Sequence, residues 1–129
     1  GCVVYYFSIR SSKESLIEEL MNRIGILAGL VGFELEKGKR MCGWEYDPDS
    51  NIRNLTQRLY VERYGKEPRF KITHASTECG LFKKAIPELD VLSIGPIIYE
   101  EHTYNEYMGV SSVKALWEFL LDIIANLKA

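Results

Sequence analysis

Apolar residues recur every three or four positions between residues 13 and 31, which is the spacing of one face of an α-helix. Ser11 or Ser12 is expected to cap the start of this helix, and Gly32 is expected to end it. The apolar stripe consists of Leu16, Leu20, Ile24, Leu27 and Val31. The pattern therefore predicts an amphipathic helix that buries one face.

The segments on either side of this helix have the composition of strands. The stretch "VVYYFSIRSS" is rich in β-branched and aromatic residues, and "FELEKGK" alternates apolar and charged positions. Together with the helix they predict a β-α-β unit over residues 2–38. The turn-rich stretch "RMCGWEYDPDS" that follows is the best candidate for a domain boundary.

A second helix is predicted for residues 49–64, because the apolar positions again follow the helical spacing and Gly65 ends the run. Strands are predicted for "RFKITH" (69–74) and "DVLSIG" (90–95), and the second is apolar enough to be buried on both faces. A short helix, "TECGLFKKAI" (77–86), lies between them. The apolar face of the helix at 49–64 consists of Ile52, Leu55, Leu59 and Tyr60.

The last helix is expected to begin with a cap at Ser111 or Ser112. Its apolar stripe consists of Val113, Leu116, Trp117, Leu120, Ile124 and Leu127. Because helices alternate with strands along the chain, the sequence predicts the α/β class.

Composition narrows the kinds of partner. The 129 residues suffice for one domain or for pieces of two. A formal net charge of −2, with basic residues scattered along the chain, gives no reason to expect nucleic acid or a membrane as partner. The three cysteines form no CxxC pair, which indicates reduced thiols and a cytoplasmic setting. The stretch "CVVYYFSI" is too short for a membrane span.

The sequence opens inside an apolar, strand-like run and has no initiator Met. A strand at the start of a chain needs a partner supplied from elsewhere. We therefore expect the chain to be a piece of something longer, and we expect it to self-associate through its uncovered strand edges.

His102 follows the predicted buried strand, and three glutamates surround it in the sequence. Ligands and catalytic groups of α/β folds gather just beyond the carboxyl ends of strands, so a metal ligand is one hypothesis for His102. A solvated loop that happens to contain an imidazole is the alternative, and from the residues alone this alternative is preferred, because exposed histidines are common. The glutamates are Glu100, Glu101 and Glu106.

Partners for a metal at His102 are few. Glu100 and Glu101 are adjacent, so in an extended segment they point to opposite sides. His74, at the end of the other predicted strand, is a further candidate. The chain contains no HxD or HExxH pattern, so no complete metal site can be assembled from it.

The stretch "HASTECG" carries a second candidate site. At a turn into a helix, the backbone N–H groups around Ser76 and Thr77 could hold a substrate carboxylate, and Glu78 could hold an amine. Alternatively, Thr77 caps the helix, Glu78 complements its dipole and Cys79 packs inward. No base is placed to activate Cys79, which argues against a cysteine nucleophile.

Arg10 is the third candidate, at the end of the first predicted strand. Its planar guanidinium could bind a carboxylate through two hydrogen bonds. The alternative is a surface arginine, and from the residues alone this alternative is preferred.

The stretch "HASTECGLFKKAIPELDVLSIGPIIYEEHTYNEYMGVSSVKALWEFL" resembles the carboxy-terminal part of the bacterial aminoacyl-histidine dipeptidases, also called peptidase D or cytosol non-specific dipeptidases. The family pattern is His-Ala-Gly-Leu-Glu-Cys-Gly-Leu, an apolar strand ending in Ile-Gly-Pro, His-Ser-Pro-Asp-Glu, and a helix with Trp and Phe. "FSIRSS" and "GWEYDPDS" resemble family segments upstream, so the resemblance covers nearly the whole chain.

The resemblance implies a two-zinc peptidase whose α/β catalytic domain is interrupted by a smaller lid domain. Residues 1–38 would end the lid, residues 39–43 would connect, and residues 44–129 would return to the catalytic domain. It implies that His102 is a zinc ligand and that Arg10 grips the substrate's terminal carboxylate.

In such a peptidase, we expect the turn at Ser76, Thr77 and Glu78 to help to orient the dipeptide. The other zinc ligands and the glutamate general base would lie in an amino-terminal half that is absent here. Ser76-Thr77 replaces Gly-Leu of the family pattern, and Thr103-Tyr104-Asn105 replaces Ser-Pro-Asp.

We therefore expect the complete protein to hydrolyse Xaa-His and other dipeptides with two zinc ions. The chain alone is expected to be inactive and to retain no zinc, since one ligand does not make a zinc site. The alternative is a stand-alone α/β binding module.

Overall fold

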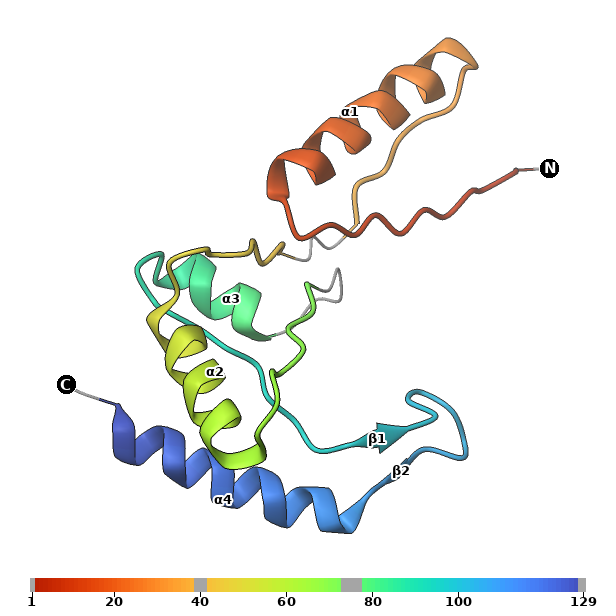
Figure 1. Ribbon diagram of the computed structural model, residues 1–129. Coiled ribbons are helices and arrows are strands. Elements are labelled where there is room, and N and C mark those ends of the chain that lie inside the picture. The colour runs from red at the N-terminus through yellow and green to blue at the C-terminus, as the bar shows by residue number, and fades with distance from the viewer. Residues whose placement is uncertain (1, 39–41, 73–77, 128–129) are drawn as a thin grey trace. The chain divides into compact units, whose positions relative to one another are not determined.

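The computed structural model describes residues 2–38, 42–72 and 78–127. These residues form two compact units, one made of Gly1–Pro48 with Lys71–Leu89 and the other of Asp49–Phe70 with Asp90–Ala129. Within the described ranges the elements, in chain order, are α1 (Glu14–Leu30), α2 (Asn51–Tyr64), α3 (Glu78–Ala85), β1 (Ile98–Tyr99), β2 (Tyr107–Met108) and α4 (Val110–Asn126) (Figure 1).

All four predicted helices are present, and their ends differ from the predictions at two caps. Gly65 ends α2 in the left-handed conformation, as predicted, at φ +65°. Helix α1 has Lys13 as its N-cap, while the Ser11 hydroxyl accepts a hydrogen bond from the Lys13 N–H at 3.1 Å. Helix α4 begins one turn earlier than a cap at Ser112 requires, with Gly109 as its N-cap.

The predicted strands are wrong wherever the structure describes them. The described parts of 3–12, 33–39, 69–74 and 90–95 contain no β-ladder, and the one sheet is the antiparallel pair β1–β2. Figure 1 shows residues 2–10 as an extended trace. The composition favours an extended backbone, but a strand also needs a neighbour to exchange hydrogen bonds with. The helices with a small sheet are compatible with the α/β class in this coarse form.

In the first unit, close backbone contacts join α1 and α3 through residues 42–43. A Cβ atom on Gly43 would lie 2.6 Å from the carbonyl oxygen of Ser12, so a side chain does not fit there. A Cβ on Gly80 would lie 3.2 Å from the carbonyl oxygen of Cys42. Glu14 Oε2 accepts a hydrogen bond from the Gly43 N–H at 3.1 Å.

The predicted apolar stripe of α1 is largely uncovered. Leu27 and Val31 are 62% and 69% exposed, and Ile17, outside the stripe, is the buried residue of this helix. The Tyr5 ring meets the Phe33 ring edge-on, with centroids 5.8 Å apart. Helical spacing therefore identified an amphipathic helix, but the described residues of this unit do not cover its apolar face.

The core of the second unit lies between α2 and α4. Leu59, Phe119 and Ile123 are buried, and Leu55 and Tyr60 pack against them. The Tyr60 ring contacts Phe119 edge-on, with centroids 5.6 Å apart. The predicted face of α2 is thus confirmed for Leu55, Leu59 and Tyr60, whereas Ile52 is not part of this cluster.

The predicted stripe of α4 is displaced from the face that packs. Phe119 is 5% exposed, whereas Trp117, which the stripe placed inside, is 59% exposed. Apolar residues cover more than half of the circumference of α4, and only the sector that faces α2 is covered. Spacing alone cannot tell which sector of such a helix finds a neighbour.

Charged and polar contacts complete the second unit. Arg63 of α2 reaches Glu118 at 2.6 Å and also pairs with Asp122, both on α4. The hydrogen bond to Asp122 is the main cause of a raised pKa at Arg63. The Asp90 carboxylate accepts hydrogen bonds from the Ser50 hydroxyl at 2.6 Å and from the Ile52 N–H at 2.8 Å. It thereby fixes the segment before β1 to the N-terminus of α2, where the helix dipole favours negative charge.

Candidate functional site

The loop that carries His102 is closed at its base by a short hairpin. Strands β1 and β2 pair Ile98 with Met108 and Tyr99 with Tyr107, and the two tyrosine rings stack with centroids 4.7 Å apart. Antiparallel pairing with stacked rings holds the two ends of the loop together.

The Ser112 hydroxyl joins this hairpin to α4. It accepts a hydrogen bond from the Ile97 N–H at 2.9 Å and donates one to the Gly109 carbonyl at 2.6 Å. The Gly109 N–H in turn donates to the Ile97 carbonyl at 3.0 Å. These three hydrogen bonds therefore fix the direction of the hairpin relative to the first turn of α4.

The loop itself is folded tightly around Thr103. The Thr103 hydroxyl donates to the Glu100 carbonyl at 2.8 Å and accepts from the Asn105 N–H at 3.2 Å. Glu100 and His102 have φ values of +51° and +65°, and they are the non-glycine residues with positive φ in the described ranges. Left-handed backbone is uncommon for residues with a Cβ and is concentrated at functional sites.

His102 is held by the glutamate four residues later. The His102 N–H donates to Glu106 Oε2 at 2.7 Å, a short hydrogen bond to a charged acceptor. The His102 side chain is exposed, as are Glu100 and Glu101. The imidazole is therefore accessible to a ligand on a loop whose backbone is fixed.

A metal ion would find an incomplete set of ligands in this part of the protein. Across residues 2–38, 42–72 and 78–127, no three His, Cys, Asp or Glu side chains are grouped so as to hold an ion. A structural or catalytic zinc needs at least three protein ligands. The described residues alone do not fit a zinc site, and His102 offers one ligand at most.

The other predicted site residues lie in the first unit or outside the description. Ser76, Thr77 and His74 lie outside the described residues. Glu78 is the exposed first residue of α3, a position where its charge complements the helix dipole. Arg10 is exposed on the extended segment before α1. Because His102 belongs to the second unit, the grouping of these residues into one substrate site stays a prediction.

Comparison with known proteins gives one informative match. No family model matches the chain. Over 121 residues, or 94% of its length, the chain is 34% identical to cytosol non-specific dipeptidase of Escherichia coli (strain K12). The chain is homologous to a carboxy-terminal part of this dipeptidase. It spans about a quarter (25%) of the dipeptidase's length. The resemblance predicted from the sequence is thus confirmed.

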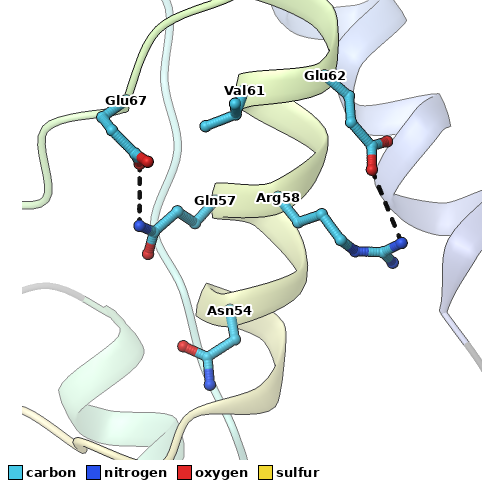
Figure 2. A pocket seen from close by; sticks show the side chains of 6 residues that line it. All are labelled: Asn54, Gln57, Arg58, Val61, Glu62 and Glu67. Atoms are coloured by element: carbon cyan, nitrogen blue, oxygen red, sulfur yellow. Dashed lines mark hydrogen bonds and ion pairs between the residues drawn. The ribbon is translucent and has the colours of Figure 1, made fainter.

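A shallow hollow on α2 is a second candidate site, beside the His102 loop. The chemistry of the hollow argues against a functional site there. Figure 2 shows that four of its polar side chains form two pairs: Gln57 donates to Glu67 at 2.9 Å, and Arg58 lies 3.9 Å from Glu62. The hollow has a volume of about 370 Å³ and no convergent catalytic groups. It is lined by Asn54, Gln57, Arg58, Val61, Glu62 and Glu67.

Two residues at the His102 loop were missed by sequence reasoning. Ser112 was predicted only as a possible helix cap, and Glu106 only as one of several nearby carboxylates. A carboxylate four residues after a histidine in a turn-rich loop is the signal that could have identified Glu106.

No helix in the described part of the chain is long and apolar enough to cross a membrane.

Proposed function

We propose that the chain is the carboxy-terminal part of a cytoplasmic zinc dipeptidase that hydrolyses Xaa-His and other dipeptides. The observation that carries this proposal is the 34% identity to cytosol non-specific dipeptidase along 94% of the chain. The remaining three-quarters of the relative has no counterpart in this sequence. The chain by itself is therefore expected to be catalytically inactive.

In this proposal His102 is one ligand of a two-zinc site whose other ligands and general base belong to the amino-terminal half. Its exposure on a tightly hydrogen-bonded loop supports this role. Zinc, when bound, would activate a water molecule and polarise the peptide carbonyl. What this chain supplies is an imidazole held in a fixed direction.

The substrate contacts proposed for this chain lie in the other unit. Arg10 would bind the free carboxylate of the dipeptide, and the turn at Ser76, Thr77 and Glu78 would help to orient it. Residues 1–38 would end a lid domain, and residues 44–129 would belong to the catalytic domain. Dipeptide and the amino-terminal half are the proposed partners, and neither nucleic acid nor a membrane is among them.

The proposal is tested by His102→Ala in the complete protein, with Asn105→Ala as a control on the same loop. Loss of a ligand should lower turnover of a dipeptide at least about a hundredfold, since loss of outer-shell partners already costs 10–100-fold. Zinc, measured by elemental analysis, should fall from two ions per chain towards one. Near-normal turnover with two zinc ions retained would make His102 an ordinary loop residue.

A stand-alone α/β binding module is the alternative. The gene upstream of Gly1 discriminates the two. A reading frame that continues into an α/β half with an HxD pattern supports the peptidase, whereas an immediate start codon supports the module.

A further inference from the structure

We propose that Glu106 is a positioning residue for His102. Its carboxylate accepts the His102 N–H and keeps the main chain of His102 in the left-handed conformation, which sets the direction of the imidazole. The conformational part of this inference stands on the loop geometry alone. Its consequence for turnover rests on the proposed function.

The backbone of His102 adopts an unfavourable conformation. At φ +65°, a residue with a Cβ is less stable than in the ordinary helical or extended regions, so a compensating contact is needed to keep it there. The bond from the His102 N–H to Glu106 Oε2 is 2.7 Å long and ends on a charged acceptor. Bonds of this kind are about twice as strong as those between neutral groups.

The other hydrogen bonds of the loop act on its other residues. The Thr103 N–H and hydroxyl both reach the Glu100 carbonyl, and the Glu106 N–H reaches the Thr103 carbonyl. These bonds fix the turn on both sides of His102. Among the hydrogen bonds found in the described residues, the one that involves His102 itself is the bond from its N–H to the Glu106 carboxylate.

The chemistry of the loop separates Glu106 from its acidic neighbours. Glu101 has the same charge and lies next to His102, but no hydrogen bond of its carboxylate is found in the described structure. A general effect of negative charge on the imidazole would come from any of these glutamates. A positioning effect should come from Glu106 alone, because only its carboxylate is bonded to the His102 backbone.

The test uses the complete protein with Glu106→Ala, Glu106→Gln and the matched control Glu101→Ala. Amide hydrogen exchange of the loop reports the conformation, and kcat and KM for a dipeptide report the consequence. In Glu106→Ala, the His102 amide should exchange at least about tenfold faster, while exchange in α4 stays unchanged. By comparison with outer-shell losses, kcat should fall about 10–100-fold with KM nearly constant.

Rescue distinguishes positioning from a general structural role. Glu106→Gln keeps an acceptor oxygen at the same place, so it should restore slow exchange of His102 and most of kcat. Glu101→Ala should leave both measurements unchanged. Unchanged exchange at His102 in Glu106→Ala, or equal effects of Glu101→Ala, would overturn the inference.

The same variants separate this inference from the proposed function. If His102→Ala leaves turnover intact while Glu106→Ala speeds exchange at His102, the metal role fails and the conformational role stands. If His102→Ala abolishes turnover while Glu106→Ala changes neither exchange nor kcat, the proposed function stands and the positioning role is refuted.

Discussion

Ser112→Ala should loosen the base of the His102 hairpin, and its neighbour Ser111 supplies a matched control. The Ser112 hydroxyl makes two hydrogen bonds, one with the Ile97 N–H and one with the Gly109 carbonyl. Ser111 lies next to it on α4 and is exposed. The two substitutions remove the same atoms from the same helix, so their difference isolates the two hydrogen bonds.

The size of the stability difference between Ser112→Ala and Ser111→Ala follows from the two hydrogen bonds that are lost and from the water that replaces part of them. A typical hydrogen bond contributes about 1 kcal/mol net, and Ile97 is exposed enough for water to replace part of the loss. Alanine is a better helix former than serine by roughly 0.5 kcal/mol, a gain that both variants share. Ser112→Ala should therefore be less stable at the hairpin than Ser111→Ala by about 1–2 kcal/mol.

Native-state hydrogen exchange at the Gly109 amide measures this difference directly, because that amide donates to the Ile97 carbonyl. A cost of about 1.4 kcal/mol corresponds to a tenfold faster exchange. Ser111→Ala should exchange at the wild-type rate or more slowly. If the two variants exchange alike at Gly109, the Ser112 bridge contributes nothing and the hairpin is held by its strands alone.

Three further predictions concern packing, substrate binding and assembly. Phe119→Ala should lower the free energy of unfolding of the second unit by about 3 kcal/mol, measured by urea denaturation, whereas Trp117→Ala should lower it by less than about 1 kcal/mol. The reverse order would mean that the stripe predicted from the sequence is the face of α4 that packs. Arg10→Lys in the complete protein should lower kcat/KM by roughly 2–3 kcal/mol of transition-state stabilisation for dipeptides with a free carboxylate. Equal losses for amidated substrates would remove carboxylate binding as the reason. The chain alone should self-associate, because residues 3–7 and much of the α1 stripe are exposed and apolar; a constant monomer mass by light scattering across micromolar concentrations contradicts this.

The helices were predictable because their signals are local. The apolar spacing of α2 placed Leu55, Leu59 and Tyr60 on one face, and the structure packs that face against α4. Gly65 ended the helix as its αL preference indicates. Each of these features depends on residues within a few positions of one another, so the sequence carries the whole of the information.

The strands were not predictable in the same way, because a strand is defined by a partner. "VVYYFSI" and "DVLSIG" have the composition of buried strands, yet neither pairs within the described residues. The two short strands that do form, β1 and β2, are joined by a seven-residue loop and needed no distant segment. Composition thus indicates a preference for an extended backbone. A β-ladder forms only where a neighbouring strand is available to pair with it.

His102 shows the same limit at the level of a site. Its position after an apolar run, and the resemblance of its surroundings, were enough to select it as a candidate. Its conformation was not predictable, because adjacent residues in an extended segment were assumed to alternate sides, and the loop instead turns twice into the left-handed region, at Glu100 and at His102. The carboxylate of Glu106 can accept the His102 N–H only in such a turn, since the i to i+4 distance in an extended chain exceeds the reach of a glutamate. The residue that holds the candidate ligand was therefore visible only once the backbone of the loop was known.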